Sequence, residues 1–325
     1  MLTAVDAVEI TILVDNLSDS LLPSTPIALR PRMSMDADAA HLRAEHGYGV
    51  LITVESGGRQ SSLLYDAGFS RDTCIHNLDV LGLRVPDLRG IALSHGHADH
   101  YGGIAGMVSR LGRTKLPLLL HPDGWLERKI VFPSYEVPVL PPTVNDLGRE
   151  GVEVMEEKGP TLLVDGTLLI SGQIERVTDF EKGFPIHYRR RGHDWEPDFM
   201  VWDDQCVVVN VRGEGLVVIS ACSHSGVINT LLNACRLCGE ERVLAFIGGW
   251  HLSPASMWPV LDRTIAEFSK FGVRYTVPGH CTGWRANAEL SRLLPDGFIQ
   301  SSVGTSVRFR AQPENSSSPP PTGFQ

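Results

Sequence analysis

The sequence lacks the features that place a protein in a membrane or in an oxidising compartment. None of its 325 residues lies in an apolar run of about 18 or more, so no membrane-spanning helix is expected. Six cysteines are too few for a disulfide-based scaffold, and the first residues do not have the pattern of a secretory signal. Only 29 basic residues stand against 38 acidic ones, which argues against nucleic-acid binding. We therefore expect a cytoplasmic protein that binds neither membranes nor nucleic acid.

The order of predicted elements favours an α+β fold. Apolar residues make up 42% of the chain and charged residues 21%, as in ordinary globular proteins. Predicted strands come in runs with helices between them, without strict βαβ alternation, which indicates two mixed β-sheets flanked by helices. We expect a single domain over residues 1–310, with long loops at about 16–47 and 125–200. Within the second of these, 161–170 predicts a hairpin and 180–198 a loop or lid. The Ser- and Pro-rich residues 311–325 are expected to be a disordered tail.

The strongest chemical signal is a cluster of histidines directly after a predicted buried strand. His95, His97, Asp99 and His100 fall within six residues and precede a predicted helix. Imidazole and carboxylate groups crowded at a strand end are costly to bury unless they share a cation. Neutral imidazole and carboxylate are ligands of divalent metals, so this segment predicts a metal site. His95 and His97 can share one ion, whereas Asp99 and His100 can face a second.

These residues identify a family resemblance. The segment 94–103, SHGHADHYGG, resembles the H-x-H-x-D-H signature of the metallo-β-lactamase superfamily. The resemblance implies an αββα sandwich with its metal site at one edge of the two sheets. Five further segments, 45–47, 221–226, 229, 248–252 and 278–283, are similar to the branch named for 7,8-dihydropterin-6-methyl-4-(β-D-ribofuranosyl)aminobenzene 5′-phosphate synthase.

The resemblance extends the candidate site to the ends of other predicted strands. Asp66 matches an aspartate that orients a ligand histidine, and His280 matches the final ligand histidine of the superfamily. The usual third-motif histidine is missing from 171–178, and the usual bridging aspartate is replaced by 222–224, Cys-Ser-His. We therefore expect His224 to complete the ligand set.

Four more residues are assigned supporting roles in this site. His251, after a Gly-Gly pair, is expected to face the substrate or transfer a proton, and Asp99 is expected to act in catalysis as well as in ligation. His46, Cys222 and Asn229 are expected to support the ligands or to contact the substrate. The run of arginines at 189–191 is expected to be a solvated surface run, with phosphate attraction as an alternative.

Three functions remain open from the sequence. The first is a metal-dependent hydrolase, in which metal-activated water attacks an ester or phosphoester. The second is a transferase that condenses a dihydropterin diphosphate with an arylamine ribofuranosyl phosphate, and the third is a metal-bearing binding protein without turnover. We expect a small-molecule substrate, phosphorylated substrates included. One or two divalent ions are expected, with zinc favoured and manganese or iron as alternatives.

Overall fold

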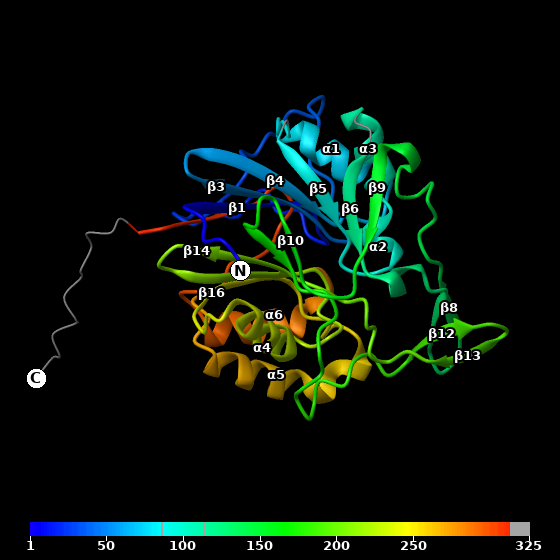
Figure 1. Cartoon of the computed structure of the whole chain (residues 1–325). Helices are drawn as coiled ribbons and strands as arrows, with labels where there is room; N and C mark the ends of the chain where they lie inside the picture. The colour runs from blue at the N-terminus through cyan, green and yellow to red at the C-terminus, as the bar shows by residue number, and fades with distance from the viewer. Residues whose placement is uncertain (86, 113–114, 313–325) are drawn as a thin grey trace, which may run out of the picture.

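Two β-sheets lie face to face between two layers of helices (Figure 1). The structure, a computed structural model, describes residues 1–85, 87–112 and 115–312. In order across the first sheet, the strands are β2 (Ala28–Leu29), β18 (Ser306–Arg310), β1 (Ala7–Val14), β3 (Gly49–Ser56), β4 (Arg59–Tyr65), β5 (Leu88–Ala92), β6 (Leu116–Leu120) and β9 (Val152–Glu156). Those of the second sheet are β10 (Thr161–Leu163), β11 (Leu168–Ile170), β14 (Val207–Val211), β15 (Gly215–Ser220), β16 (Val243–Gly249) and β17 (Tyr275–Gly279). The predicted αββα sandwich of mixed sheets is confirmed.

Helices cover the outer face of each sheet. The first sheet carries α1 (Thr73–Val80) and α3 (Ile104–Leu111), and the short α2 (Ala98–Tyr101) lies close to them. The second carries α4 (Val227–Cys238), α5 (Trp258–Lys270) and α6 (Trp284–Leu293). Single 3-10 turns lie at η1 (Pro122–Trp125), η2 (Arg149–Gly151), η3 (Ala255–Met257) and η4 (His280–Thr282). None of the helices in the described parts of the chain is long and apolar enough to span a membrane.

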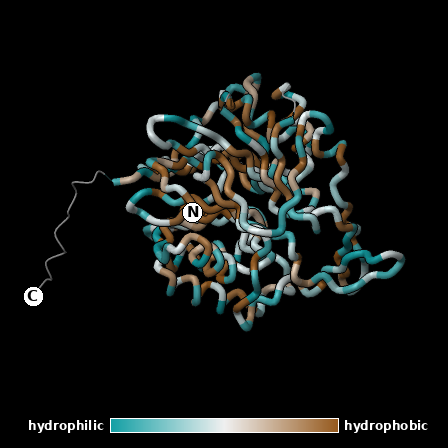
Figure 2. The backbone as a smooth tube through the Cα atoms, viewed as in Figure 1, coloured by the Kyte–Doolittle hydropathy of each residue, from teal (hydrophilic) through white to brown (hydrophobic). Residues whose placement is uncertain are grey.

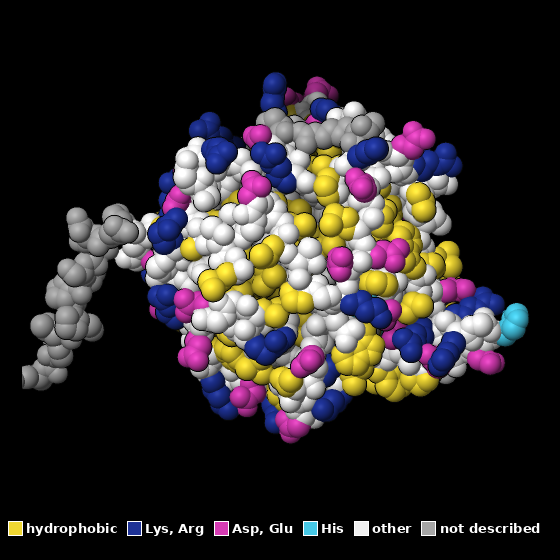
Figure 3. All heavy atoms as spheres, viewed as in Figure 1, with side chains coloured by type: hydrophobic (Ala, Val, Ile, Leu, Met, Phe, Trp, Pro, Cys, Tyr) yellow, Lys and Arg dark blue, Asp and Glu magenta, His cyan; other side chains and the backbone are white. Residues whose placement is uncertain are grey.

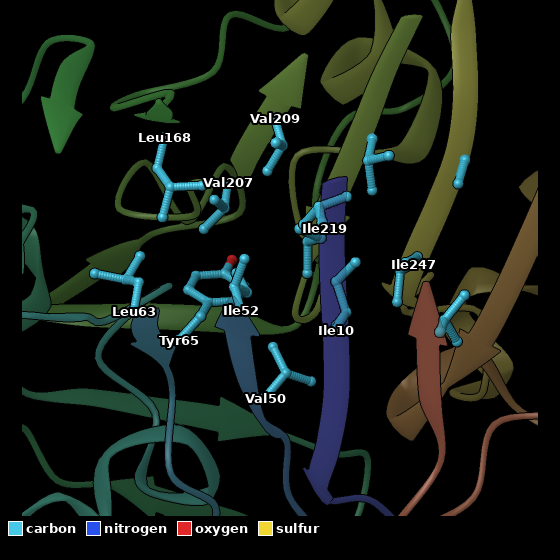
Figure 4. Close-up of a cluster of buried hydrophobic side chains, with 14 of the residues drawn as sticks. Ile10, Val50, Ile52, Leu63, Tyr65, Leu168, Val207, Val209, Ile219 and Ile247 are labelled. Carbon is cyan, nitrogen blue, oxygen red and sulfur yellow. The ribbon is translucent and has the colours of Figure 1, made fainter. Parts of the chain in front are cut away.

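The main core is the layer between the two sheets. Side chains alternate between the two faces of a strand, so in β1 Ile10 and Ile12 point to this layer whereas Leu13 packs toward the helices. Figure 4 shows Val50 and Ile52 from the first sheet close to Val207 and Ile219 from the second. The hydropathy colouring in Figure 2 is accordingly brown along the central strands and teal on the outer loops. Burial of this layer fixes the two sheets relative to each other.

The predicted site segments follow the carboxyl ends of parallel strands. β4 pairs in parallel with β5, and β15, β16 and β17 are also parallel to one another. Asp66 directly follows β4, and the histidine motif begins three residues after the end of β5. The segments 221–226, 250–252 and 280–283 follow β15, β16 and β17. Carboxyl ends of parallel strands meet at one edge of a sheet, so the sandwich brings these distant segments together.

A third, smaller sheet extends from the side of the sandwich (Figures 1 and 3). It consists of β7 (Arg128–Val131), β8 (Glu136–Val139), β12 (His187–Arg191) and β13 (Asp194–Pro197), and we call it the arm. One of its hairpins follows β6 of the first sheet, and the other lies between β11 and β14 of the second. The arm is therefore built from both halves of the sandwich.

The arm corrects the prediction of a long loop at 125–200 and of a loop or lid at 180–198. Strands β8 and β13 are almost entirely exposed, so they carry no buried apolar alternation from which strands could be predicted. The same stretch also contains β9, which joins the first sheet, and the predicted hairpin at 161–170 is confirmed as β10 and β11. By contrast, residues 16–47 contain only β2 and are otherwise irregular, as predicted. Of the predicted disordered tail, 311–325, residues 313–325 lie outside the described residues.

Candidate metal centre

Five imidazole rings gather at the edge of the sandwich where the parallel strands end. The His95 ring lies 4.4 Å from the His97 ring, 4.2 Å from the His100 ring and 4.7 Å from the His224 ring, measured between centroids. The fifth ring, His280, is 5.0 Å from His100. All five side chains are buried, although they come from three separate segments of the chain. We call these five residues, together with Asp99, the histidine cluster.

Buried Asp66 fixes the orientation of two of these imidazoles. Its Oδ2 accepts hydrogen bonds from His100 Nδ1 at 2.7 Å and from the Ser94 hydroxyl at 2.6 Å, and its Oδ1 accepts the Ser94 N–H at 2.7 Å. Because the Ser94 hydroxyl hydrogen is used on Asp66, its oxygen accepts from His95 Nδ1 at 2.9 Å. The Nε2 lone pairs of His95 and His100 are thereby left for the cluster interior. This is the supporting hydrogen bond that metal-ligating histidines require.

The first candidate position for an ion lies between His95, His97 and His224. Each residue offers one nitrogen, and these nitrogens all lie within 4.8 Å of one another. His95 Nε2 and His224 Nε2 face each other at 3.2 Å. On a tetrahedral ion with bonds of about 2.0–2.1 Å, two nitrogens are separated by about 3.3 Å. The observed spacing therefore fits one shared divalent ion.

A second candidate position surrounds the carboxylate of Asp99. Its Oδ2 lies 3.4 Å from His280 Nε2, 3.7 Å from His100 Nε2 and 3.4 Å from His46 Nε2. His100 Nε2 is buried and makes no hydrogen bond within the described residues, so it is an unpaired acceptor aimed at this position. His46 differs from the others because its side chain is 69% exposed. It therefore lies at the mouth of the cluster.

The electrostatics of the cluster favour the metal-binding forms of Asp99 and of the three histidines at the first position. Burial and the neighbouring imidazoles lower the pKa of His95, His97 and His224 well below its usual value, so these rings are neutral at pH 7. Burial raises the pKa of Asp99, but His100 and the hydrogen-bonded His280 outweigh burial and lower it overall. Burial lowers the pKa of His280, but Cys281 and Asp99 outweigh burial and raise it to about 9. The neutral rings of His95, His97 and His224 are thus in the form that binds a divalent cation, whereas His280 would release a proton on binding one.

Two buried thiols and His251 lie next to the first position. The His251 ring is 4.1 Å from the His224 ring, and its Nδ1 is 3.7 Å from Cys222 Sγ. Cys222 Sγ in turn contacts Cys281 Sγ at 3.2 Å. His251 Nε2 is buried without a hydrogen-bond partner within the described residues. The structure thus places His251 and Cys222 beside the predicted ligands, and their roles stay predictions.

Backbone strain is concentrated in the same place. Four residues there have φ between 47° and 58°: Asp66, Ser223, His251 and His280. Residues other than glycine rarely adopt this left-handed backbone conformation. Within the motif itself, Gly96 passes so close to the chain that an added Cβ would come within 2.2 Å of the Gly124 carbonyl oxygen. Strain of this kind is retained where the surrounding structure holds side chains for a function.

Asn229 and the arginine run contact other partners. Asn229 Oδ1 accepts the N–H groups of Val177 and Thr178, and its Nδ2 donates to the carbonyl oxygens of Glu181 and Ser225. Its side chain thus joins α4 to the 177–181 segment and to Ser225, the residue that follows His224. The arginines at 189–191 lie in β12 of the arm and form ion pairs with Glu127 and Glu196.

One residue at the cluster was missed by the sequence reasoning. His187 is buried at the start of β12, and its Nε2 lies 3.0 Å from His97 Nε2. No motif marks it, because it comes from the arm and follows the irregular segment 171–186. Its burial between exposed arginines and an irregular segment is visible only once the arm has been placed against the sandwich.

The family is shown by a direct comparison with known proteins. The family model of the metallo-beta-lactamase superfamily matches residues 45–234, more than half of the 325 residues. The chain therefore belongs to the metallo-β-lactamase superfamily, a superfamily of enzymes that typically depend on metal ions.

Curated relatives and a solved structure extend this result. The chain is 28% identical over 276 residues to the 7,8-dihydropterin-6-methyl-4-(beta-D-ribofuranosyl)-aminobenzene-5'-phosphate synthase of Methanocaldococcus jannaschii, a match that covers 82% of this chain and 90% of that protein. A second protein of that organism, the uncharacterized protein MJ0448, is 27% identical over 265 residues, covering 80% and 92%. The crystal structure of Tm1679, described as a metal-dependent hydrolase of the beta-lactamase superfamily, superposes with a TM-score of 0.71 at 24% identity and covers 93% of this chain and 99% of its own. The predicted resemblance to the superfamily and to the synthase branch is confirmed.

Proposed function

We propose that the protein is a metal-dependent hydrolase of a small ester or phosphoester. The observation that carries this proposal is the pair of facing nitrogens, His95 Nε2 and His224 Nε2, whose 3.2 Å separation matches two ligands of one tetrahedral ion. His97 completes this position, and Asp99, His100 and His280 would hold a second ion. Zinc is the favoured metal because imidazole predominates, with manganese and iron as alternatives.

A divalent ion bound here supplies Lewis acidity, which acidifies water and stabilises negative charge on a substrate oxygen. The protein's own residues supply orientation and proton transfer. Asp66 holds His95, through Ser94, and His100 in fixed tautomers, so the site is organised before substrate arrives. His251 is the candidate for proton transfer to the leaving group, because its unpaired Nε2 lies beside the cluster. Asp99 is the candidate carboxylate for orienting the attacking water.

A transferase is the second candidate, and the similarity to the named synthase favours it. That relative's name describes the formation of a phosphorylated arylamine conjugate. Applied to this chain, the same cluster would bind a phosphorylated substrate, and an amine would take the place of water as the attacking group. Both candidates therefore use one metal centre and differ in the acceptor. A small-molecule substrate is common to the two.

The two candidates are separated by supplying or withholding an amine acceptor. Purified protein, loaded in turn with zinc, manganese or iron, would be assayed on phosphodiester, phosphomonoester, lactone and dihydropterin diphosphate substrates, with and without an arylamine ribofuranosyl phosphate. Hydrolysis that needs no amine, and that is abolished by chelation and in His97→Ala, supports the hydrolase. Turnover of a dihydropterin diphosphate only in the presence of the amine would establish the transferase instead. Activity that survives in His97→Ala would contradict both.

A further inference from the structure

The arm reaches the histidine cluster through one side chain, His187. Its Nδ1 lies 3.1 Å from the carbonyl oxygen of Asp198, and its Nε2 lies 3.0 Å from His97 Nε2. A carbonyl oxygen only accepts, so Nδ1 carries the hydrogen and donates it. In a neutral imidazole the other nitrogen is then an acceptor, and the hydrogen between the two rings belongs to His97 Nε2.

The direction of this hydrogen bond determines which nitrogen of His97 is free. With the hydrogen on Nε2, the lone pair of His97 is on Nδ1, so Nδ1 is the atom available to an ion. Reversal of the bond would leave the Nδ1 of His97 protonated and unable to bind. His187 therefore selects both the tautomer and the ring orientation of His97, the task that Asp66 performs for His100 on the other side of the cluster.

A buried ionic network holds His187 in place. Arg128, at the start of β7, donates to Asp198 at 2.9 Å and to both oxygens of Asp203 at 2.9 and 2.6 Å. Asp203 also accepts the N–H of Gly96, inside the histidine motif, at 2.8 Å. All three charged side chains are buried, and the two carboxylates share the one guanidinium. Buried charges held by such contacts keep their geometry, because removing the partner of a buried charge is costly.

We infer that His187 is a positioning residue through which the arm sets the metal affinity of His97. This inference rests on the proposed metal centre and deepens it. The arm joins a hairpin from each half of the sandwich. Its His187 contacts a side chain of the histidine motif directly, and its Arg128 is paired with Asp203, which accepts a hydrogen bond from the backbone of that motif. The metal centre is thus supported from outside the sandwich as well as from inside it.

Two substitutions separate the acceptor function of His187 from its packing. In His187→Gln the side-chain amide reaches the place of Nε2 and keeps an acceptor for His97. In His187→Asn the amide falls at the place of Nδ1, so it keeps the bond to Asp198 and loses the acceptor. The matched control is His193→Asn, an exposed histidine in the turn of the same arm. Each chelator-stripped protein would be titrated with zinc against a chromophoric chelator and with cobalt for its visible spectrum, and its unfolding followed by circular dichroism.

We expect His187→Asn to weaken zinc binding about 10–100-fold and to shift the cobalt spectrum, the usual scale for lost support of a ligand histidine. His187→Gln and His193→Asn should bind within about threefold of wild type. Equal weakening by the Asn and Gln changes, or affinity unchanged by His187→Asn, would overturn the inference. If His187→Asn fails to fold, the cobalt spectrum of His187→Gln decides. A wild-type spectrum in that variant would support the inference, and a lost spectrum would overturn it. Wild-type protein that binds neither metal would instead overturn the proposed function.

Discussion

The histidine cluster is supported from two sides, and the two supports have different origins. On the sandwich side, Asp66 at the end of β4 binds His100 directly and His95 through Ser94. On the arm side, His187 at the start of β12 binds His97. The first support belongs to adjacent parallel strands of one sheet, whereas the second depends on a separate sheet built from two distant hairpins. Neighbouring histidines of one motif are thus held by different parts of the fold.

The difference shows how rigidity is achieved on each side. Asp66 is held by three hydrogen bonds at the edge of the main core. The arm has little apolar core of its own, since most of its residues are partly or fully exposed. Its base is instead fixed by the buried charges of Arg128, Asp198 and Asp203. Packing stabilises the first support and electrostatics the second.

The largest effect is expected from Arg128→Met. The change leaves the buried carboxylates of Asp198 and Asp203 without their cation, so the free energy of unfolding should fall by about 3–5 kcal/mol. Urea denaturation of chelator-treated protein measures the change. The control, Arg190→Met, removes an exposed pair with Glu127 in the same arm and should cost less than about 1 kcal/mol. Similar losses in both variants would mean that the arm is not held by its buried base.

A pH-dependent effect of similar size is expected from Glu181, which precedes the arm's second hairpin and caps the start of α4. Burial raises its pKa to about 7 from 4.5, against the opposing effect of the N–H groups of Ile228 and Asn229. A raised pKa means that the folded state binds the Glu181 proton more tightly than the unfolded state does. The stability that this proton provides is fully present below pH 4.5 and is lost as pH rises toward 7. Relative to Glu181→Gln, the wild type should therefore lose about 3 kcal/mol between pH 4.5 and 8. Parallel pH profiles of the two proteins in urea denaturation would contradict this.

His251→Ala tests whether the residue that follows the end of β16 takes part in catalysis, rather than holding a metal-binding histidine in place. Among the described residues its Nε2 has no hydrogen-bond partner, and its ring lies 4.1 Å from that of His224. Turnover on the true substrate should fall about a hundredfold, the usual scale for a lost proton-transfer group, with metal content unchanged. Steady-state kinetics and metal analysis of the same preparation provide both readouts. Loss of metal would make His251 a ligand, and unchanged turnover would remove it from the mechanism.

Asp66→Asn gives the smallest expected effect and sharpens the comparison with His187. The amide keeps the shape of the carboxylate but has only one acceptor oxygen. In the wild type, Ser94 and His100 donate hydrogen bonds to both carboxylate oxygens. Zinc affinity should fall about 10–100-fold, as for the loss of the arm-side support. Combining Asp66→Asn with His187→Asn should lower affinity by roughly the product of the two factors, because the supports act on different histidines. A double variant no weaker than either single one would show that both supports act on one ligand.

The sandwich side could be predicted from the sequence because its residues lie next to strand ends. Asp66, His95, His224, His251 and His280 each follow a predicted strand within a few residues, and parallel strands bring such positions together. The runs of predicted strands, together with the resemblance, were enough to predict the sandwich. The hydrogen bonds that connect Asp66 to His95 through Ser94 were not predicted, since a serine beside a histidine motif carries no signal of its own.

The arm could not be predicted for physical reasons. Its strands have four or five residues and are largely exposed, so they lack the alternation that burial imposes on sequence. Its two hairpins are separated by more than 45 residues, and they pair with each other through β7 and β12. His187 therefore gained its place beside His97 from tertiary packing alone.

Metal analysis of wild-type protein and His97→Ala, purified side by side without added metal, tests the metal centre most directly. His97 belongs to the first ion position but contributes little to the core, so the variant should still unfold cooperatively. We expect about one or two divalent ions per wild-type chain, and loss of the ion in the variant. Wild-type protein that retains no ion even after incubation with excess zinc and dialysis, or a variant that binds as much as wild type, would contradict the assignment of the histidine cluster as a metal centre.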